Sequence, residues 1–170
     1  QDGESAWHYK EKSGEGCEPH LRNKIYGITN RNSQTVYSDF VCTVIKGYVP
    51  PDRTAEIINT NLPYINGCST ESLIPPIRAG DPTMQILYMP PNSSEQEEHI
   101  HSTVRVVYVL SGSGTSISGR CLDSPEGDDE QELQSGDVLI LDKMVPHHFV
   151  TYKEPLVCSP LHVWSSTSTE

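Results

Sequence analysis

The sequence predicts an all-β fold, because short β-favouring segments recur along the chain and turn residues interrupt them at frequent intervals. Helical periodicity is nearly absent; one short helix is expected over Arg53–Asn59, with Asp52 as its cap. The chain has 170 residues, enough for one domain to bury a core and fold alone. Only 35% of the residues are hydrophobic, which favours long polar loops or polar ends.

The N-terminal half has the weaker pattern. Residues 1–20 are polar and are expected to form an arm. Residues 21–82 are expected to hold N-terminal strands, the best of them within Ser38–Val49, followed by a proline-rich, irregular segment over Asn61–Pro82 that wraps the body. The boundary of the next region is therefore placed at residue 83.

The C-terminal half has the stronger pattern, and residues 83–165 are expected to form the core of a barrel or sandwich. Its strands are expected at Thr83–Met89, from His99 to Leu110, at Val138–Leu141, at Pro146–Val150 and at Leu156–Trp164. Asp123–Glu132 holds six acidic residues and is expected to be a solvated hairpin loop, and residues 166–170 a polar tail.

Charge and cysteine usage exclude several classes of function. The net charge is −11 and no basic patch is present, which argues against a nucleic-acid partner. No apolar run approaches the roughly 18–20 residues of a membrane helix. The five scattered cysteines form no CxxC pair, so we expect reduced thiols and a cytoplasmic location. The chain begins at Gln1 rather than Met, so a removed leader stays open as the alternative.

Two histidines one residue apart carry the functional signal. In a strand, residues two apart project from the same face, so His99 and His101 point together, and Arg105 and Val107 share that face. Imidazole is a good ligand for Fe, Ni, Cu and Zn, and with oxygen donors for Mn. The pair therefore predicts half of a metal site at the mouth of a barrel.

Two spacings in this region resemble the motifs of the cupins. His99-x-His101, position 105 and Gly112 have the spacing of the first cupin motif, and Gly136 followed eleven residues later by His147 has that of the second. The resemblance covers roughly Met84–Trp164. It implies a double-stranded β-helix, or jelly-roll barrel, commonly a homodimer, with a divalent metal held by His99, His101 and His147.

The chain departs from the family pattern at a residue that matters chemically. Where the first motif has its glutamate ligand, this chain has Arg105, and a guanidinium beside a cation is repelled. Either Arg105 turns away and binds a substrate carboxylate, or the metal site is degenerate and Arg105 holds an anion or a structural carboxylate such as Glu97 or Glu98. Turn residues differ as well, at Ser93, Asp142, Met144 and Thr151.

Further candidates follow from strand alternation. Val107 and Phe149 are expected to face the ligand, together with either Met84, Ile86 and Tyr88 or Gln85, Leu87 and Met89 from the neighbouring strand. Tyr88 and His162 are expected substrate contacts, and Tyr88, Glu97 and His162 are the only candidates for a general base. His8, His20 and His148 are expected to lie outside the site.

Three functions remain open at this point. The first is a metal-dependent enzyme acting on a small anionic substrate, by dioxygenase-type chemistry or by Lewis-acid isomerase or lyase chemistry. The second is a non-catalytic cupin that binds or senses a small molecule. The third is a structural barrel with a vestigial site. Fold alone does not choose among them.

Overall fold

The computed structural model describes eight stretches of the chain: residues 4–11, 24–31, 42–46, 53–56, 62–76, 80–94, 98–119 and 129–163. They fall into two compact units, residues 1–59 and 60–170. Strands dominate both units, and among the described residues the only helical element is the 3-10 turn Ile65–Gly67. The all-β prediction is therefore confirmed. No helix in the described stretches is long and apolar enough to cross a membrane.

The first unit contains one antiparallel sheet with strand order β3-β1-β2-β4. Its strands are β1 (Glu4–Glu11), β2 (Lys24–Arg31), β3 (Cys42–Lys46) and β4 (Arg53–Glu56). The short helix expected over Arg53–Asn59 is wrong where the structure describes it, because Arg53–Glu56 pairs with β2 and this pairing overrides the local pattern. The polar arm expected over residues 1–20 likewise contains a strand, β1.

The second unit carries the functional motifs and begins with β5 (Leu62–Pro63), the turn η1 (Ile65–Gly67) and β6 (Ser69–Ile74). This segment was expected to be irregular. Its proline-rich composition hid β6, which pairs along β7 with a bulge between Ser72 and Ile74. Pairing with a strong neighbouring strand again outweighs the local pattern.

Six more strands complete the unit, after the two already named: β7 (Thr83–Met89), β8 (Val104–Ser118), β9 (Asp129–Gln134), β10 (Val138–Leu141), β11 (His147–Val150) and β12 (Leu156–Val163). The main sheet has the order β10-β8-β12-β7-β6-β5, and β9 and β11 pair with β8 outside this path. Trp164, the expected end of the last strand, lies outside the described residues.

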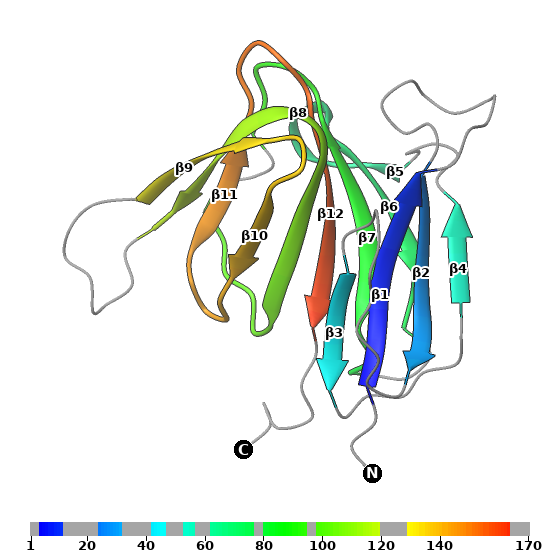
Figure 1. Cartoon of the computed structure of the whole chain (residues 1–170). Coiled ribbons are helices and arrows are strands. Elements are labelled where there is room, and N and C mark those ends of the chain that lie inside the picture. Colours follow the sequence, from blue (N-terminus) through cyan, green and yellow to red (C-terminus); the bar gives the residue numbers. More distant parts are fainter. Residues whose placement is uncertain are drawn as a thin grey trace. The chain divides into compact units, whose positions relative to one another are not determined.

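Strand β8 joins the two sheets of this unit, and Figure 1 shows it bending from one to the other. Its first half pairs with β10 and β12, and its second half with β9 and β11. The bend includes Gly112, whose φ is +79° and where a Cβ atom would collide with the carbonyl of Pro155. Only glycine meets both requirements, so the motif glycine is needed for the shape of the strand.

The core lies on the inner face of this unit. Val107 and Val109 of β8 are essentially inaccessible to solvent, as is Cys158 of β12. Strand alternation places these side chains on the same face as Arg105, which is nearer the start of β8. One strand thus contributes a dry core at its middle and a polar site at its beginning.

Candidate metal and anion site

The histidine pair lies just before β8 rather than inside it. His99 forms an isolated β-bridge with His147, in which its N–H donates to the carbonyl of His147 at 3.2 Å and its own carbonyl accepts from His147 at 2.9 Å. The strand itself begins at Val104. The expectation of a continuous strand from His99 is therefore wrong. The position of His99 and His101 is set instead by the bridge between His99 and His147.

Three imidazole rings converge at this point. One ligand nitrogen from each of His99, His101 and His147 lies within 4.8 Å of the other two. The ring centroids are 4.6 Å apart for His99 and His101, 4.7 Å for His99 and His147, and 5.2 Å for His101 and His147. Small side-chain rotations suffice to bring such a group onto one ion.

The hydrogen bonding of His147 suits a metal ligand. Its Nδ1 lies 2.8 Å from the carbonyl oxygen of Val145, and a carbonyl only accepts, so Nδ1 carries the proton. The lone pair of Nε2 is then available to a metal, and the backbone holds the ring in place. His147 is also 2% exposed, which limits competition from water.

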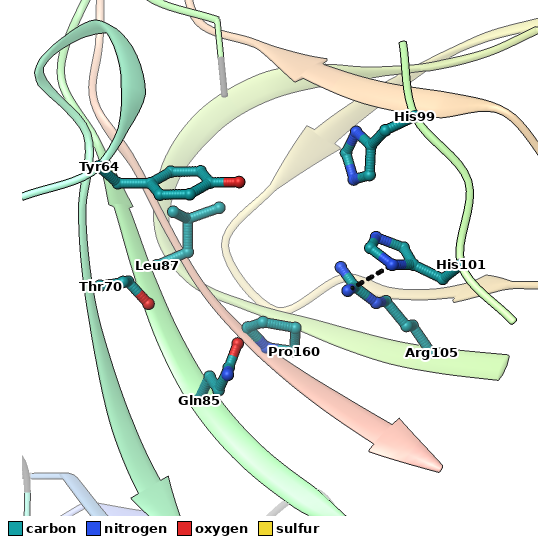
Figure 2. Close-up of a pocket in the computed structure, with 8 residues that line it drawn as sticks. All are labelled: Tyr64, Thr70, Gln85, Leu87, His99, His101, Arg105 and Pro160. Atoms are coloured by element: carbon teal, nitrogen blue, oxygen red, sulfur yellow. Dashed lines mark hydrogen bonds between the residues drawn. The ribbon is translucent and has the colours of Figure 1, made fainter. Parts of the chain in front are cut away.

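In His101 the roles of the two ring nitrogens are reversed relative to His147. Its Nδ1 lies 2.8 Å from Nη2 of Arg105, and Figure 2 shows this contact beside His99. A guanidinium only donates, so Nδ1 accepts and a neutral ring carries its proton on Nε2. Within the described residues, that buried Nε2 has no hydrogen-bond partner. Leaving such a group unsatisfied costs about 1–3 kcal/mol.

Burial favours the neutral form of three histidines in or beside this site, His101, His147 and His162. It lowers the pKa of His101 to about 3, with Arg105 and the neighbouring histidines adding to the effect. Burial followed by Arg105 lowers the pKa of His162 to about 4. Burial also lowers the pKa of His147, against an opposing effect of the Val145 carbonyl. Neutral imidazole is the form that binds metals.

The site opens into a cavity of about 210 Å³. Its described lining residues include no carboxylate, although the whole chain has a net charge of −11. In Figure 2, His99, His101 and Arg105 form one side, and Tyr64 extends its hydroxyl towards them from the other. The lining residues are Tyr64, Thr70, Gln85, Leu87, His99, His101, Arg105 and Pro160.

The sequence left open whether the side chains of Met84, Ile86 and Tyr88 or those of Gln85, Leu87 and Met89 face the ligand. The structure favours the second set. Gln85 and Leu87 line the cavity, and Tyr88 projects from the opposite face of β7. Tyr88 is therefore corrected as a substrate contact and as a candidate base. Glu97, the second candidate base, lies outside the described residues.

The remaining expected contacts stand behind the cavity. Val107 and Phe149 are 1% and 3% exposed and belong to the core cluster rather than to the lining. His162 pairs in register with Arg105, and its ring centroid is 6.2 Å from that of His101. His162 thus lies near His99, His101 and His147, but it is not one of the three histidines whose ligand nitrogens converge.

Sequence reasoning missed three lining residues, Tyr64, Thr70 and Pro160, and left a fourth, Gln85, undecided. Tyr64 and Thr70 come from the segment expected to be irregular, so no strand face could be assigned to them. Gln85 was available only as one of two alternatives. It is the one amide side chain in the run Met84–Met89, which is otherwise aliphatic or aromatic, and this was the signal that could have singled it out.

Two departures from the cupin motifs contact each other. The N–H of Ser93 donates to the Thr151 hydroxyl at 3.0 Å, and the N–H of Thr151 donates to the Ser93 carbonyl at 2.8 Å. The Thr151 hydroxyl donates in turn to the carbonyl of Pro90. The substituted residues therefore tie the end of β11 to the turn before the histidine segment.

A third departure leaves backbone strain. Met144 stands where the second motif has glycine, and its φ of +63° lies in the left-handed region that disfavours side chains. Its N–H donates to the carbonyl of His101 at 2.7 Å, which holds it in that conformation. This loop therefore contacts the His101 side of the site directly.

Comparison with known proteins assigns part of the chain to a family. The cupin domain model matches residues 85–164. No curated protein matches the sequence. Among solved structures, an oxalate oxidase in complex with glycolate is similar with a TM-score of 0.51 and 17% identity, over 59% of this chain and 52% of that one.

Two other solved structures have lower TM-scores. The DMSP lyase DddQ from Ruegeria pomeroyi is 21% identical over 61% of this chain and 49% of its own, with a TM-score of 0.48. The polyketide cyclase RemF from Streptomyces resistomycificus is 23% identical over 56% of this chain and 63% of its own, with a TM-score of 0.46. This chain thus spans about half to two thirds of these proteins. Residues 85–164 of this protein are a cupin domain with a jelly-roll barrel fold.

Proposed function

We propose that this protein is a metal-dependent enzyme that acts on a small anionic substrate, with a carboxylate as the most suitable anion. The observation that supports this proposal is a group of three converging histidines, two of which line a cavity together with Arg105, and the described lining of that cavity contains no acid. His99, His101 and His147 would hold a divalent metal: Fe, Mn, Ni, Cu or Zn.

The orientation of His147 supports metal binding. Its Nδ1 is occupied by the Val145 carbonyl, so Nε2 faces the site with a lone pair. A bound metal would supply Lewis acidity and, if redox-active, a binding position for dioxygen. The two reaction classes expected from the sequence, dioxygenase-type and isomerase or lyase chemistry, both use these properties.

Arg105 supports an anionic substrate. It is a permanent cation with a planar fork of donors that fits a carboxylate, and it lies in the cavity wall beside His101. The cavity is smaller than the roughly 300–1,000 Å³ of sites for drug-sized ligands, so a substrate of a few carbon atoms is favoured. Gln85 and Tyr64 add hydrogen-bonding groups on the facing walls.

A second candidate is a cupin that binds an anion without metal or catalysis. The bond between Arg105 and His101 favours it, because that bond occupies one of the three histidines. Anion binding measured in the presence of a chelator separates the candidates. A homodimer and a cytoplasmic location stay as predictions from the sequence.

The test of the enzyme proposal starts with metal. Purified protein is titrated with Mn, Fe, Ni, Cu and Zn, and bound metal is counted per chain. We expect about one ion per chain, and His147→Ala should lower metal affinity by at least about 100-fold because a fixed ligand is lost. His148→Ala is the matched control, since His148 projects from the other side of β11.

Activity is then measured on small carboxylic acids with the loaded protein. Oxygen consumption reports dioxygenase chemistry, and proton NMR of the acid reports isomerisation or cleavage without oxygen. Failure of every metal to bind stoichiometrically would contradict the metal site. Metal binding without turnover of any acid, together with tight anion binding to chelator-treated protein, would favour the binding function instead.

A further inference from the structure

We infer that Arg105 and the metal are alternative partners of His101, so that metal binding releases Arg105 and an anion that takes up Arg105 strengthens metal binding. The inference rests on the proposed metal site and adds to it the coupling between its two ligands. The shared element is a single imidazole ring.

The contact with Arg105 determines which nitrogen of His101 carries the proton. In the contact of 2.8 Å with Nη2 of Arg105, Nδ1 must accept, because a guanidinium has no lone pair to offer. A neutral imidazole has one proton, which is then on Nε2. Nε2 in this state is a donor, and a donor cannot bind a metal.

Both ways of placing a metal on His101 break this contact. If Nε2 is the ligand, the proton moves to Nδ1, and Nδ1–H then faces an N–H of Arg105. If Nδ1 is the ligand, the guanidinium already occupies the direction of its lone pair. The charge of Arg105 acts in the same sense, because it repels a cation at close range.

The other histidine with a known ring orientation shows no such conflict. The Val145 carbonyl takes the Nδ1 proton of His147 and leaves Nε2 ready for a metal. His147 is thus set for a metal, and His101 is set for Arg105. The buried Nε2 of His101 has no partner within the described residues. This nitrogen is therefore the one that a further ligand of the site could engage.

An anion is the group best suited to receive the released Arg105. The described lining of the cavity offers hydroxyl, amide and imidazole groups but no carboxylate. A carboxylate ligand would therefore pair with Arg105 and leave His101 to the metal. Coupling of this kind is reciprocal: the anion raises metal affinity by the same factor by which the metal raises anion affinity.

The test measures Zn²⁺ affinity with a competing chromophoric chelator, in potassium acetate and in potassium chloride of equal ionic strength. For the unaltered chain we expect acetate to tighten Zn²⁺ binding by about fivefold or more. Arg105→Met removes both the donor and the charge. It should bind Zn²⁺ about tenfold or more tightly in chloride, and the acetate effect should vanish.

Lys153→Met is the matched control, because Lys153 is exposed and loses the same charge. It should keep both the affinity and the acetate effect of the unaltered chain. Circular dichroism establishes that each variant is folded. Zn²⁺ binding by Arg105→Met that is equal or weaker, or an unchanged acetate effect, would overturn this inference alone. Absence of stoichiometric Zn²⁺ in every folded variant would overturn the proposed metal site as well.

Discussion

The two sides of the candidate site use the same residue type in opposite ways. On the β11 side, His147 is nearly inaccessible, and the backbone carbonyl of Val145 fixes its ring. On the side that leads into β8, His101 is held by a side chain, Arg105, and its second nitrogen has no partner among the described residues. A backbone partner fixes a histidine permanently, whereas a side-chain partner can leave.

This difference should appear first in the pH dependence of folding stability. Burial and Arg105 lower the pKa of His101 from its usual 6.5 to about 3, so the unfolded chain binds a proton that the folded chain refuses. Stability from this group is present above pH 6.5 and is lost as the pH falls towards 3. By pH 5 the loss is below about 2 kcal/mol, because solvent screens the charges around this partly exposed ring.

We therefore expect His101→Gln to reduce the loss of stability between pH 7 and pH 5, measured by urea unfolding of metal-free protein. His147→Gln should reduce it less, because the Val145 carbonyl opposes the effect of burial on the His147 pKa. Thr70→Val alters the cavity wall without removing an ionisable group and is the control. Equal slopes for His101→Gln and the control would contradict the expected difference.

A slightly smaller effect on folding stability is expected at Thr151, which ties the end of β11 to the turn at Ser93. Thr151→Val removes the hydroxyl that accepts from the buried N–H of Ser93 and donates to Pro90. Unfolding stability should fall by about 1–2 kcal/mol, because buried polar groups lose their partner. Thr151→Ser keeps the hydroxyl and should lose less than about 1 kcal/mol. If both variants lose equally, the hydroxyl is not what holds this side together.

The smallest effect is expected on the His101 side, at Met144. Glycine adopts a φ of +63° without the penalty that Met144 bears, and Met144 is 55% exposed, so little packing is lost. Met144→Gly should raise unfolding stability by about 0.5–1 kcal/mol. The gain is the relief of the left-handed backbone strain, reduced by the greater conformational entropy that glycine gives the unfolded chain. Met144→Ala keeps the penalty and should bring no gain. A gain from alanine as well would show that the side chain, not the backbone, is strained.

The sequence predicted the parts of this molecule that depend on local pattern. Motif spacing was enough to bring His99, His101 and His147 together and to place Arg105 beside them, although the continuous strand expected from His99 is absent because β8 begins at Val104. Motif spacing could not determine which nitrogen of each ring carries the proton. That depends on one carbonyl and one guanidinium whose positions are set only in the folded chain.

The parts that failed depend on pairing between distant segments. Thr70 reaches the cavity because β6 pairs with β7, although the composition of its segment suggests a loop. Tyr88 was misplaced because alternation defines two faces of a strand without saying which is inner. Ser93 and Thr151 looked like independent losses of turn residues, and only the fold shows that they are hydrogen-bonded to each other.

The most direct test of the contrast between His101 and His147 is the protonation of the two rings, read by long-range ¹⁵N–¹H NMR of labelled protein before and after Zn²⁺ is added. In metal-free protein we predict the proton on Nε2 of His101 and on Nδ1 of His147. Zn²⁺ should move the His101 proton to Nδ1, or replace Arg105 at that nitrogen, and leave the proton of His147 in place. A His101 ring that carries its proton on Nδ1 without metal, and is unchanged by it, would contradict the proposed competition.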